Sequence, residues 1–149
     1  MQAVQDNLPH NFMYYWWVLF VAQFPISSFI MSYVSGWHRL TMRFSAQWEP
    51  YGQTQSTGLF PYSVQMRFTN YNFLIRITAA EDALYLSVLF FLRICHPPLR
   101  VPWDEIQFSR TKSIWGSYVV LTLGNQEKIP MRISESMARK LGILERIPN

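Results

Sequence analysis

Cysteine and histidine are the residue types in this chain that are best suited to nucleophilic or metal chemistry. The single cysteine, Cys95, is followed directly by His96. A thiolate nucleophile needs a base within hydrogen-bond distance, but adjacent side chains on an extended segment point to opposite faces. We therefore expect Cys95 to be structural. A single cysteine also excludes an intrachain disulfide, and this permits a reducing compartment.

The other candidates for catalysis are equally isolated. The three histidines (His10, His38 and His96) lack the short spacings typical of zinc ligands. The acidic pairs Glu81-Asp82 and Asp104-Glu105 lie beside expected turns or strand ends, where polar side chains satisfy the backbone. The sequence contains no glycine-rich phosphate loop, nucleophile elbow or dinucleotide fingerprint. We expect a protein that is not an enzyme and that uses no metal or other cofactor.

An apolar run near the amino terminus is the most informative element. Residues 13–34 contain no Asp, Glu, Lys, Arg or His. As a helix this run would be roughly 33 Å long, against a hydrocarbon core of about 30 Å. Residues suited to the membrane interface lie at its two ends: Tyr14, Tyr15, Trp16 and Trp17 at one end, and Tyr33, Trp37, Arg39 and Arg43 at or just after the other. The run therefore predicts a transmembrane helix in contact with membrane lipids.

Polar residues interrupt the run. Pro25 removes a backbone donor and would kink a helix. Gln23, Ser27 and Ser28 would cost free energy facing lipid, and such residues are common where membrane helices meet. We assign these three to a helix–helix contact with other membrane protein subunits. An interfacial or re-entrant segment and a buried helix of a soluble fold are the alternatives.

Charges beside the run predict its orientation. Residues 1–12 form a tail with Asp6 and no Lys or Arg, a pattern that also disfavours a cleaved signal peptide. Arg39 and Arg43 follow the run, and basic flanks favour the cytoplasmic side. We expect a single-pass protein of the cell (inner) membrane with its amino terminus outside and its carboxy-terminal domain in the cytoplasm.

The net charge of +4 is modest, with 13 Lys and Arg against nine Asp and Glu. The basic residues are dispersed along the chain and form no dense run. This pattern argues against a nucleic-acid partner.

Residues 35–50 mix apolar and basic side chains in a pattern typical of a short amphipathic helix. It could lie at the membrane surface or be the first helix of the domain. The following stretch, 51–62, is rich in turn-forming residues, with room for one short strand. The domain that follows the juxtamembrane segment, 51–149, is long enough for one core.

From Val64 onward, alternating apolar residues predict strands. We expect a hairpin that joins 64–68 to 73–78 through a turn at 69–72, and a central strand over 83–92. A last hairpin should join 118–123 to 128–133, and Pro130 should place the final strand at a sheet edge. Ser134 should cap a carboxy-terminal helix with an apolar stripe, made by Met137, Ala138, Leu141 and Leu144.

Three segments carry a resemblance: SGWHRLTMRF, ALYLSVLFFLRICHPPLRVPWDEI and VVLTLGNQEKIPMRIS. They resemble an uncharacterised bacterial family, and LRVPWDEI followed by a hairpin and a helix is similar to bacterial PH-like and GRAM-type domains. The resemblance implies an α+β fold, with one amino-terminal transmembrane helix before a PH-like antiparallel β-barrel or sandwich with a carboxy-terminal helix. Phosphoinositide-binding PH domains carry basic residues at their first hairpin loop, whereas Thr69–Asn72 has none.

Two functions from different classes fit these features. The first is a non-catalytic accessory or scaffold subunit of a larger membrane protein complex, for example of respiratory or photosynthetic type. The second is a membrane-tethered module that binds a lipid headgroup or a peptide, the peptide by adding a strand to a sheet edge. The sequence does not identify the partner.

Overall fold

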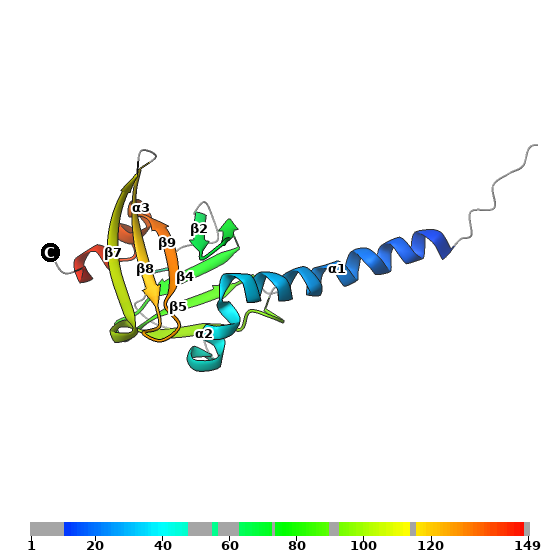
Figure 1. Cartoon of the computed structure of the whole chain (residues 1–149), viewed down its shortest axis with the longest axis horizontal. Helices are drawn as coiled ribbons and strands as arrows, with labels where there is room; N and C mark the ends of the chain where they lie inside the picture. Colours follow the sequence, from blue (N-terminus) through cyan, green and yellow to red (C-terminus); the bar gives the residue numbers. More distant parts are fainter. Residues whose placement is uncertain are drawn as a thin grey trace, which may run out of the picture.

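A long helix projects from a β-rich domain in the computed structural model of this chain (Figure 1). The structure describes residues 11–47, 55–56, 63–72, 74–89, 93–113 and 116–147. The helix, α1 (Asn11–Ser35), continues through Pro25 and is followed at Gly36 by α2 (Trp37–Phe44). Within the described residues, α1 alone is long and apolar enough to cross a membrane, a property that signal sequences share. The predicted α+β class with an amino-terminal apolar helix is confirmed.

The domain contains two antiparallel sheets. One has the order β1-β4-β5-β6 and the other β3-β2-β9-β8-β7. The strands are β1 (Gln55–Ser56), β2 (Ser63–Met66), β3 (Thr69–Asn72), β4 (Ile75–Ala79), β5 (Ala83–Val88), β6 (Leu99–Pro102), β7 (Ile106–Ser113), β8 (Gly116–Leu123) and β9 (Ile129–Ser134). A short helix η2 (Trp103–Glu105) precedes β7, and α3 (Glu135–Lys140) and η3 (Ile143–Arg146) follow β9. The sheets do not close into a barrel, so the barrel form of the prediction is wrong.

One hydrophobic core joins both sheets to α2 and α3. Strands β8 and β9 each bury every second residue along most of their length, as expected when one sheet face is covered. Helix α2 contributes Trp37, Leu40 and Phe44 to the core, and Ser45, directly after the helix, forms a β-bridge with Leu99 at the start of β6. Of the two roles left open for residues 35–50, the structure therefore favours the helix that belongs to the domain.

The first hairpin differs from the prediction. Residues 69–72, expected as a turn, form β3 and pair with β2, and the turn lies at Arg67 and Phe68. Arg67 adopts a φ of 51°, in the left-handed region. Tyr71 explains the difference, because this fully buried side chain at the centre of β3 outweighs the turn preference of the asparagines beside it. Strand β4 instead pairs with β5 in the other sheet.

Pro130 does not mark a sheet edge, so that prediction is also wrong. It lies in β9, between β2 and β8. The backbone N–H of Arg67 donates to the Pro130 carbonyl at 2.8 Å. Since the N–H and C=O of one strand residue point to the same side, the missing N–H of Pro130 faces the place where β2 ends at Met66. A central strand tolerates proline there because the paired part of β2 and β9 ends at Met66 and Met131, the residue directly after Pro130.

Other local predictions are confirmed. Strand β5 is central in its sheet, between β4 and β6, but it ends at Val88, so Leu89 lies beyond it, and residues 90–92 of the predicted strand lie outside the described residues. Strands β8 and β9 form the expected hairpin. The Ser134 hydroxyl accepts a hydrogen bond from the Met137 N–H and caps α3. Leu141, directly after α3, is buried.

Candidate functional site

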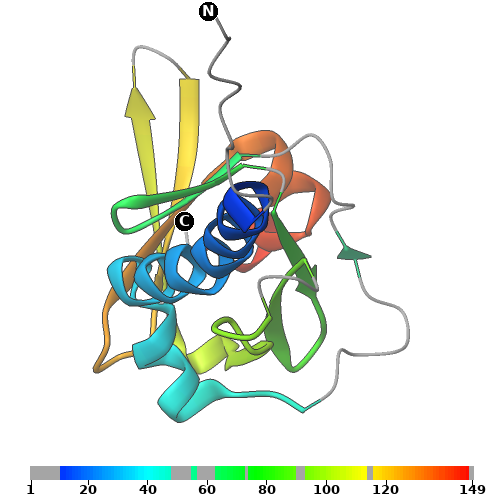
Figure 2. The same ribbon diagram turned by 90° about the vertical axis from the view of Figure 1, so that its right-hand side faces the viewer.

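The two parts of α1 have opposite surroundings. From Tyr14 to Ser27 its side chains are exposed, and those of Tyr14, Tyr15, Trp16 and Trp17 are 60 to 66% exposed. Ser28, Ser32 and Ser35 are buried at its other end. Their spacing of four and three residues places them on one helix face. Figure 2, viewed from the amino-terminal end of α1, shows the helix in front of the domain on which this face rests.

These three serines, with Tyr71 and His96, form a polar cluster that we call the junction cluster. The Ser32 hydroxyl donates to the Cys95 carbonyl at 2.7 Å. His96 Nδ1 lies 3.4 Å from the Ser28 hydroxyl, and its Nε2 lies 2.9 Å from the Tyr71 hydroxyl. Tyr71 in turn donates to the Ser35 hydroxyl at 2.8 Å. The cluster thus connects α1 to β3 and to the segment that enters β6.

Trp37 extends the junction cluster into the core. Its backbone N–H donates to the Ser35 hydroxyl, and its indole N–H donates to the Pro97 carbonyl at 3.0 Å. Its ring lies 5.3 Å from that of His96 and 5.8 Å from that of Tyr71, between centroids. A buried polar network whose members satisfy one another makes a rigid joint. We therefore describe α1 and the domain as one body.

The environment of Tyr71 and His96 suits a structural role. Burial raises the pKa of Tyr71 to about 12, and the hydrogen bond with Ser35 opposes this rise. The phenol therefore stays neutral near neutral pH and remains a hydrogen-bond donor. The His96 side chain is 0% exposed, and each of its ring nitrogens lies beside a hydroxyl group. This arrangement positions helices and strands relative to one another.

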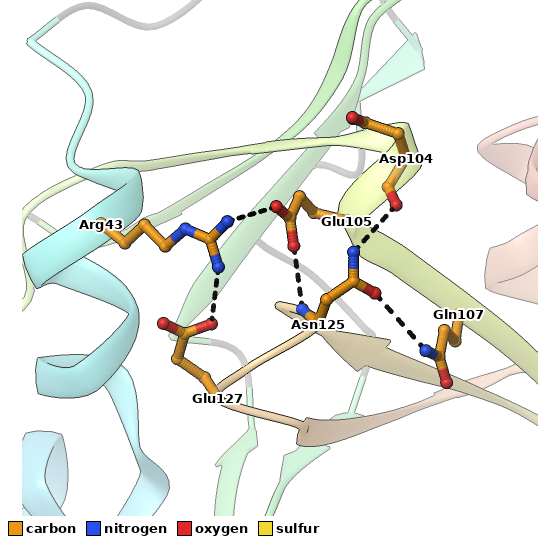
Figure 3. A network of polar contacts seen from close by, with 6 residues as sticks. All are labelled: Arg43, Asp104, Glu105, Gln107, Asn125 and Glu127. Carbon is orange, nitrogen blue, oxygen red and sulfur yellow. Dashed lines mark hydrogen bonds and ion pairs between the residues drawn. The ribbon is translucent and has the colours of Figure 1, made fainter.

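A second polar network joins α2 to the turn between β8 and β9 (Figure 3). Arg43 lies 2.5 Å from a carboxylate oxygen of Glu105 and 3.6 Å from one of Glu127. The other Glu105 oxygen accepts from the backbone N–H of Asn125 at 2.9 Å. The Asn125 side chain donates to the Asp104 carbonyl and accepts from Gln107. Arg43 therefore pairs its charge within the domain.

The residues expected at the membrane interface do not all lie at the surface. The four aromatic residues at positions 14–17 are exposed, as are Tyr33 and Arg39. Trp37 differs from the expectation, because it is 0% exposed and belongs to the core. Its position directly after the apolar run suggested an interface residue. The chain changes direction at Gly36, between α1 and α2, and the Trp37 indole packs in the core. The expected tail lies outside the described residues for positions 1–10.

The residues assigned to a helix–helix contact separate into two groups. Gln23 and Ser27 are exposed, and the Ser27 hydroxyl donates to the Gln23 carbonyl. Ser28 is buried against the protein's own domain. Sequence reasoning did not assign Ser32, Ser35 or Tyr71 to a site. The repeated serine spacing was a usable signal for the first two, since small polar residues on one face of an apolar helix mark a contact.

Residues of the two acidic pairs form ion pairs and hydrogen bonds with neighbouring parts of the domain. Asp82 forms an ion pair with Arg100 at 2.8 Å, and the hydrogen bond from Arg100 is the main reason that the pKa of Asp82 is lowered. Among the described residues, no three His, Cys, Asp or Glu side chains are grouped to hold a metal ion.

Comparisons with known family profiles, with curated proteins and with solved structures found no match to this chain. Function is therefore inferred from α1 and the junction cluster.

Proposed function

We propose that this protein is a non-catalytic accessory or scaffold subunit, anchored by α1 in a larger membrane protein complex. One observation carries the proposal: α1 joins a long exposed and mostly apolar surface, from Tyr14 to Ser27, to a domain that holds its other end through buried hydrogen bonds. Soluble monomers rarely expose so many large apolar side chains side by side. A bilayer would cover this surface and fix the domain at a defined position beside its partners.

Gln23 and Ser27 mark the helix face that would contact a partner subunit. At about 100° per residue, Gln23 lies roughly 140° around the helix from Ser28. The domain therefore occupies one side of α1 and leaves the Gln23 side open. Hydrogen bonds between membrane helices contribute about 0.6 kcal/mol on average and up to roughly 1.7 kcal/mol. A partner helix could take up the Gln23 side chain, which is costly to leave in lipid.

The proposal includes a location and a family relationship. The protein would cross the cell (inner) membrane once, with its amino terminus outside and the domain in the cytoplasm. The exposed Arg39 on α2, after the span, supports this orientation. Successive antiparallel strands that end in α3 support a PH-like relationship, even though the two sheets remain open.

Co-purification in mild detergent tests the accessory role. We expect the full chain to extract from membranes together with stable partner subunits. Gln23→Leu should stay in the membrane fraction but lose a large part of those partners. Phe29→Leu is the matched control, because Phe29 is also exposed but lies on a different face of α1. A wild-type protein that purifies alone, or a Gln23→Leu variant that keeps every partner, would contradict the proposal.

A binding module is the second candidate, and strand β7 is the observation that favours it. This eight-residue strand forms the edge of its sheet and pairs only with β8 among the described strands. A long edge strand offers backbone donors and acceptors to an extended peptide. A lone protein that binds peptides or lipid headgroups in the same purification would favour this function over the accessory role.

A further inference from the structure

The turn between β5 and β6 carries an exposed apolar side chain beside α1. Ile94, at the centre of this turn, is 79% exposed. Together with the helix it lines an open apolar groove of about 670 Å³, whose other residues are Trp17, Val18, Val21, Ala22, Phe24 and Pro25. Most of the surface that Ile94 faces therefore belongs to the part of α1 that we place in the membrane.

Hydrogen bonds hold this turn against the helix. The Cys95 carbonyl accepts from the Ser32 hydroxyl, and the His96 N–H donates to the Arg93 carbonyl at 3.3 Å. His96 is itself part of the junction cluster. The position of Ile94 along α1 is thus set by the same contacts that fix α1 to the domain.

The length of the exposed helix places the turn at the depth of the hydrocarbon. From Tyr14 to Ser27, before the first residue buried against the domain, α1 measures roughly 21 Å. Counting from its first residue, Asn11, gives roughly 25 Å. The hydrocarbon core of a bilayer is about 30 Å thick. The last turns of α1, and the protein segments bonded to them, must cover the remaining distance.

We infer that the Arg93–Cys95 turn enters the bilayer beside α1, with Ile94 and the groove covered by lipid acyl chains. This inference rests on the proposed membrane anchoring of α1. The occupant of the groove is lipid because its lining is continuous with the apolar surface of α1. Arg93 beside Ile94 is held by the domain, because its Nε–H donates to the Val88 carbonyl at 3.3 Å, and the stem of its long side chain can stay in apolar surroundings. The domain would then sit partly immersed in the membrane.

An environment-sensitive fluorophore can measure the depth of this turn. The full chain carries Cys95→Ser, so that a single introduced cysteine takes the label. Three variants are compared: Ile94→Cys in the turn, Leu19→Cys in the exposed part of α1, and Ser136→Cys on α3, at the far side of the domain from α1 (Figure 1). All three positions are exposed, so the label should not disturb the core. Each protein is reconstituted in vesicles of phosphatidylcholine and phosphatidylglycerol, with or without bromine on the acyl chains.

The expected result is a blue-shifted emission that acyl-chain bromine quenches at positions 19 and 94, and no quenching at position 136. A label at position 94 that behaves like the one at position 136, while position 19 is quenched, would overturn the inference and leave the anchoring intact. Absence of quenching at position 19 would instead contradict the membrane anchoring itself, and the inference with it. The two failures are therefore distinguishable.

Discussion

Tyr71 is the residue on which the joint between helix and domain depends most. Its hydroxyl lies within hydrogen-bond distance of Ser35 on α1 and of His96 before β6, and its ring packs against Trp37. Neither partner lies near it in the sequence: Ser35 is 36 residues away and His96 is 25 away. One side chain therefore links three segments. Removing its hydroxyl should weaken the contacts between α1 and the domain as a whole.

Tyr71→Phe should lower the free energy of unfolding by about 1 to 3 kcal/mol at neutral pH, because buried polar groups of Ser35 and His96 lose a partner. Folding also raises the pKa of Tyr71 from 10.0 to about 12, so the neutral phenol is favoured in the folded state. That contribution is complete below pH 10 and is lost as the pH rises toward 12. The variant should lack this alkaline loss.

Thermal melting in detergent at neutral and alkaline pH measures both effects. Tyr33→Phe is the control, because the Tyr33 side chain is exposed and its pH response should match the wild type. An alkaline loss of stability that is equally steep in Tyr71→Phe would assign the titration to another group.

At the scale of elements, Gly36 decides how α1 passes into α2. Its φ of 83° lies in the left-handed region, which glycine adopts at low cost. A Cβ built on this residue would lie 2.6 Å from Cδ1 of Ile129, a buried residue at the start of β9. Glycine is therefore favoured at position 36 for two reasons: its backbone is left-handed, and it lies too close to the core for a side chain.

Gly36→Ala should destabilise the protein by about 2 to 5 kcal/mol, because a left-handed alanine costs about 1 to 2 kcal/mol and overpacking adds about 1 to 3 kcal/mol. Adding Ile129→Val removes Cδ1 and should recover part of the loss. Gly116→Ala is the comparison, since that glycine also has a positive φ but no atom lies within 4 Å of its Cβ position. Chemical denaturation checks the series, and a double variant no more stable than Gly36→Ala would rule out the contact with Ile129.

At the scale of the whole molecule, the rigid joint ties the orientation of the domain to that of α1. If the amino terminus faces outward, the domain must lie on the cytoplasmic side, apart from the Arg93–Cys95 turn that we place in the bilayer. The ion pairs of Arg43 with Glu105 and Glu127 reduce the positive charge that this flank presents to the membrane. The proposed orientation would therefore depend more on Arg39 than on Arg43.

Cysteine labelling in intact cells should report this orientation. In a Cys95→Ser background, a membrane-impermeant maleimide should label Gln2→Cys and should fail to label Asn125→Cys, which lies in the exposed turn before β9. Asn125→Cys should react once the membrane is opened, and this controls for burial. If only position 125 is labelled in intact cells, the protein has the opposite orientation to the one proposed. Arg39→Gln would then be the variant in which to look for a mixture of both orientations.

Features that depend on local sequence could be predicted without the structure. The apolar run specifies a long helix by composition, the alternation in β8 and β9 specifies a hairpin, and Ser134 caps α3 through a residue three positions away. Each of these signals acts over a few residues, within the reach of helix and strand periodicity.

Pairing and burial across long separations were decided only by the tertiary structure. Residues 69–72 form a strand because Tyr71 is needed in the core, and Pro130 is central because β2 ends opposite it. Ser28 contacts its own domain through His96, 68 residues away. The sequence determined that α1 has an apolar surface and a polar face. Which surface meets the domain depended on contacts between distant segments, whose free energies no local pattern encodes.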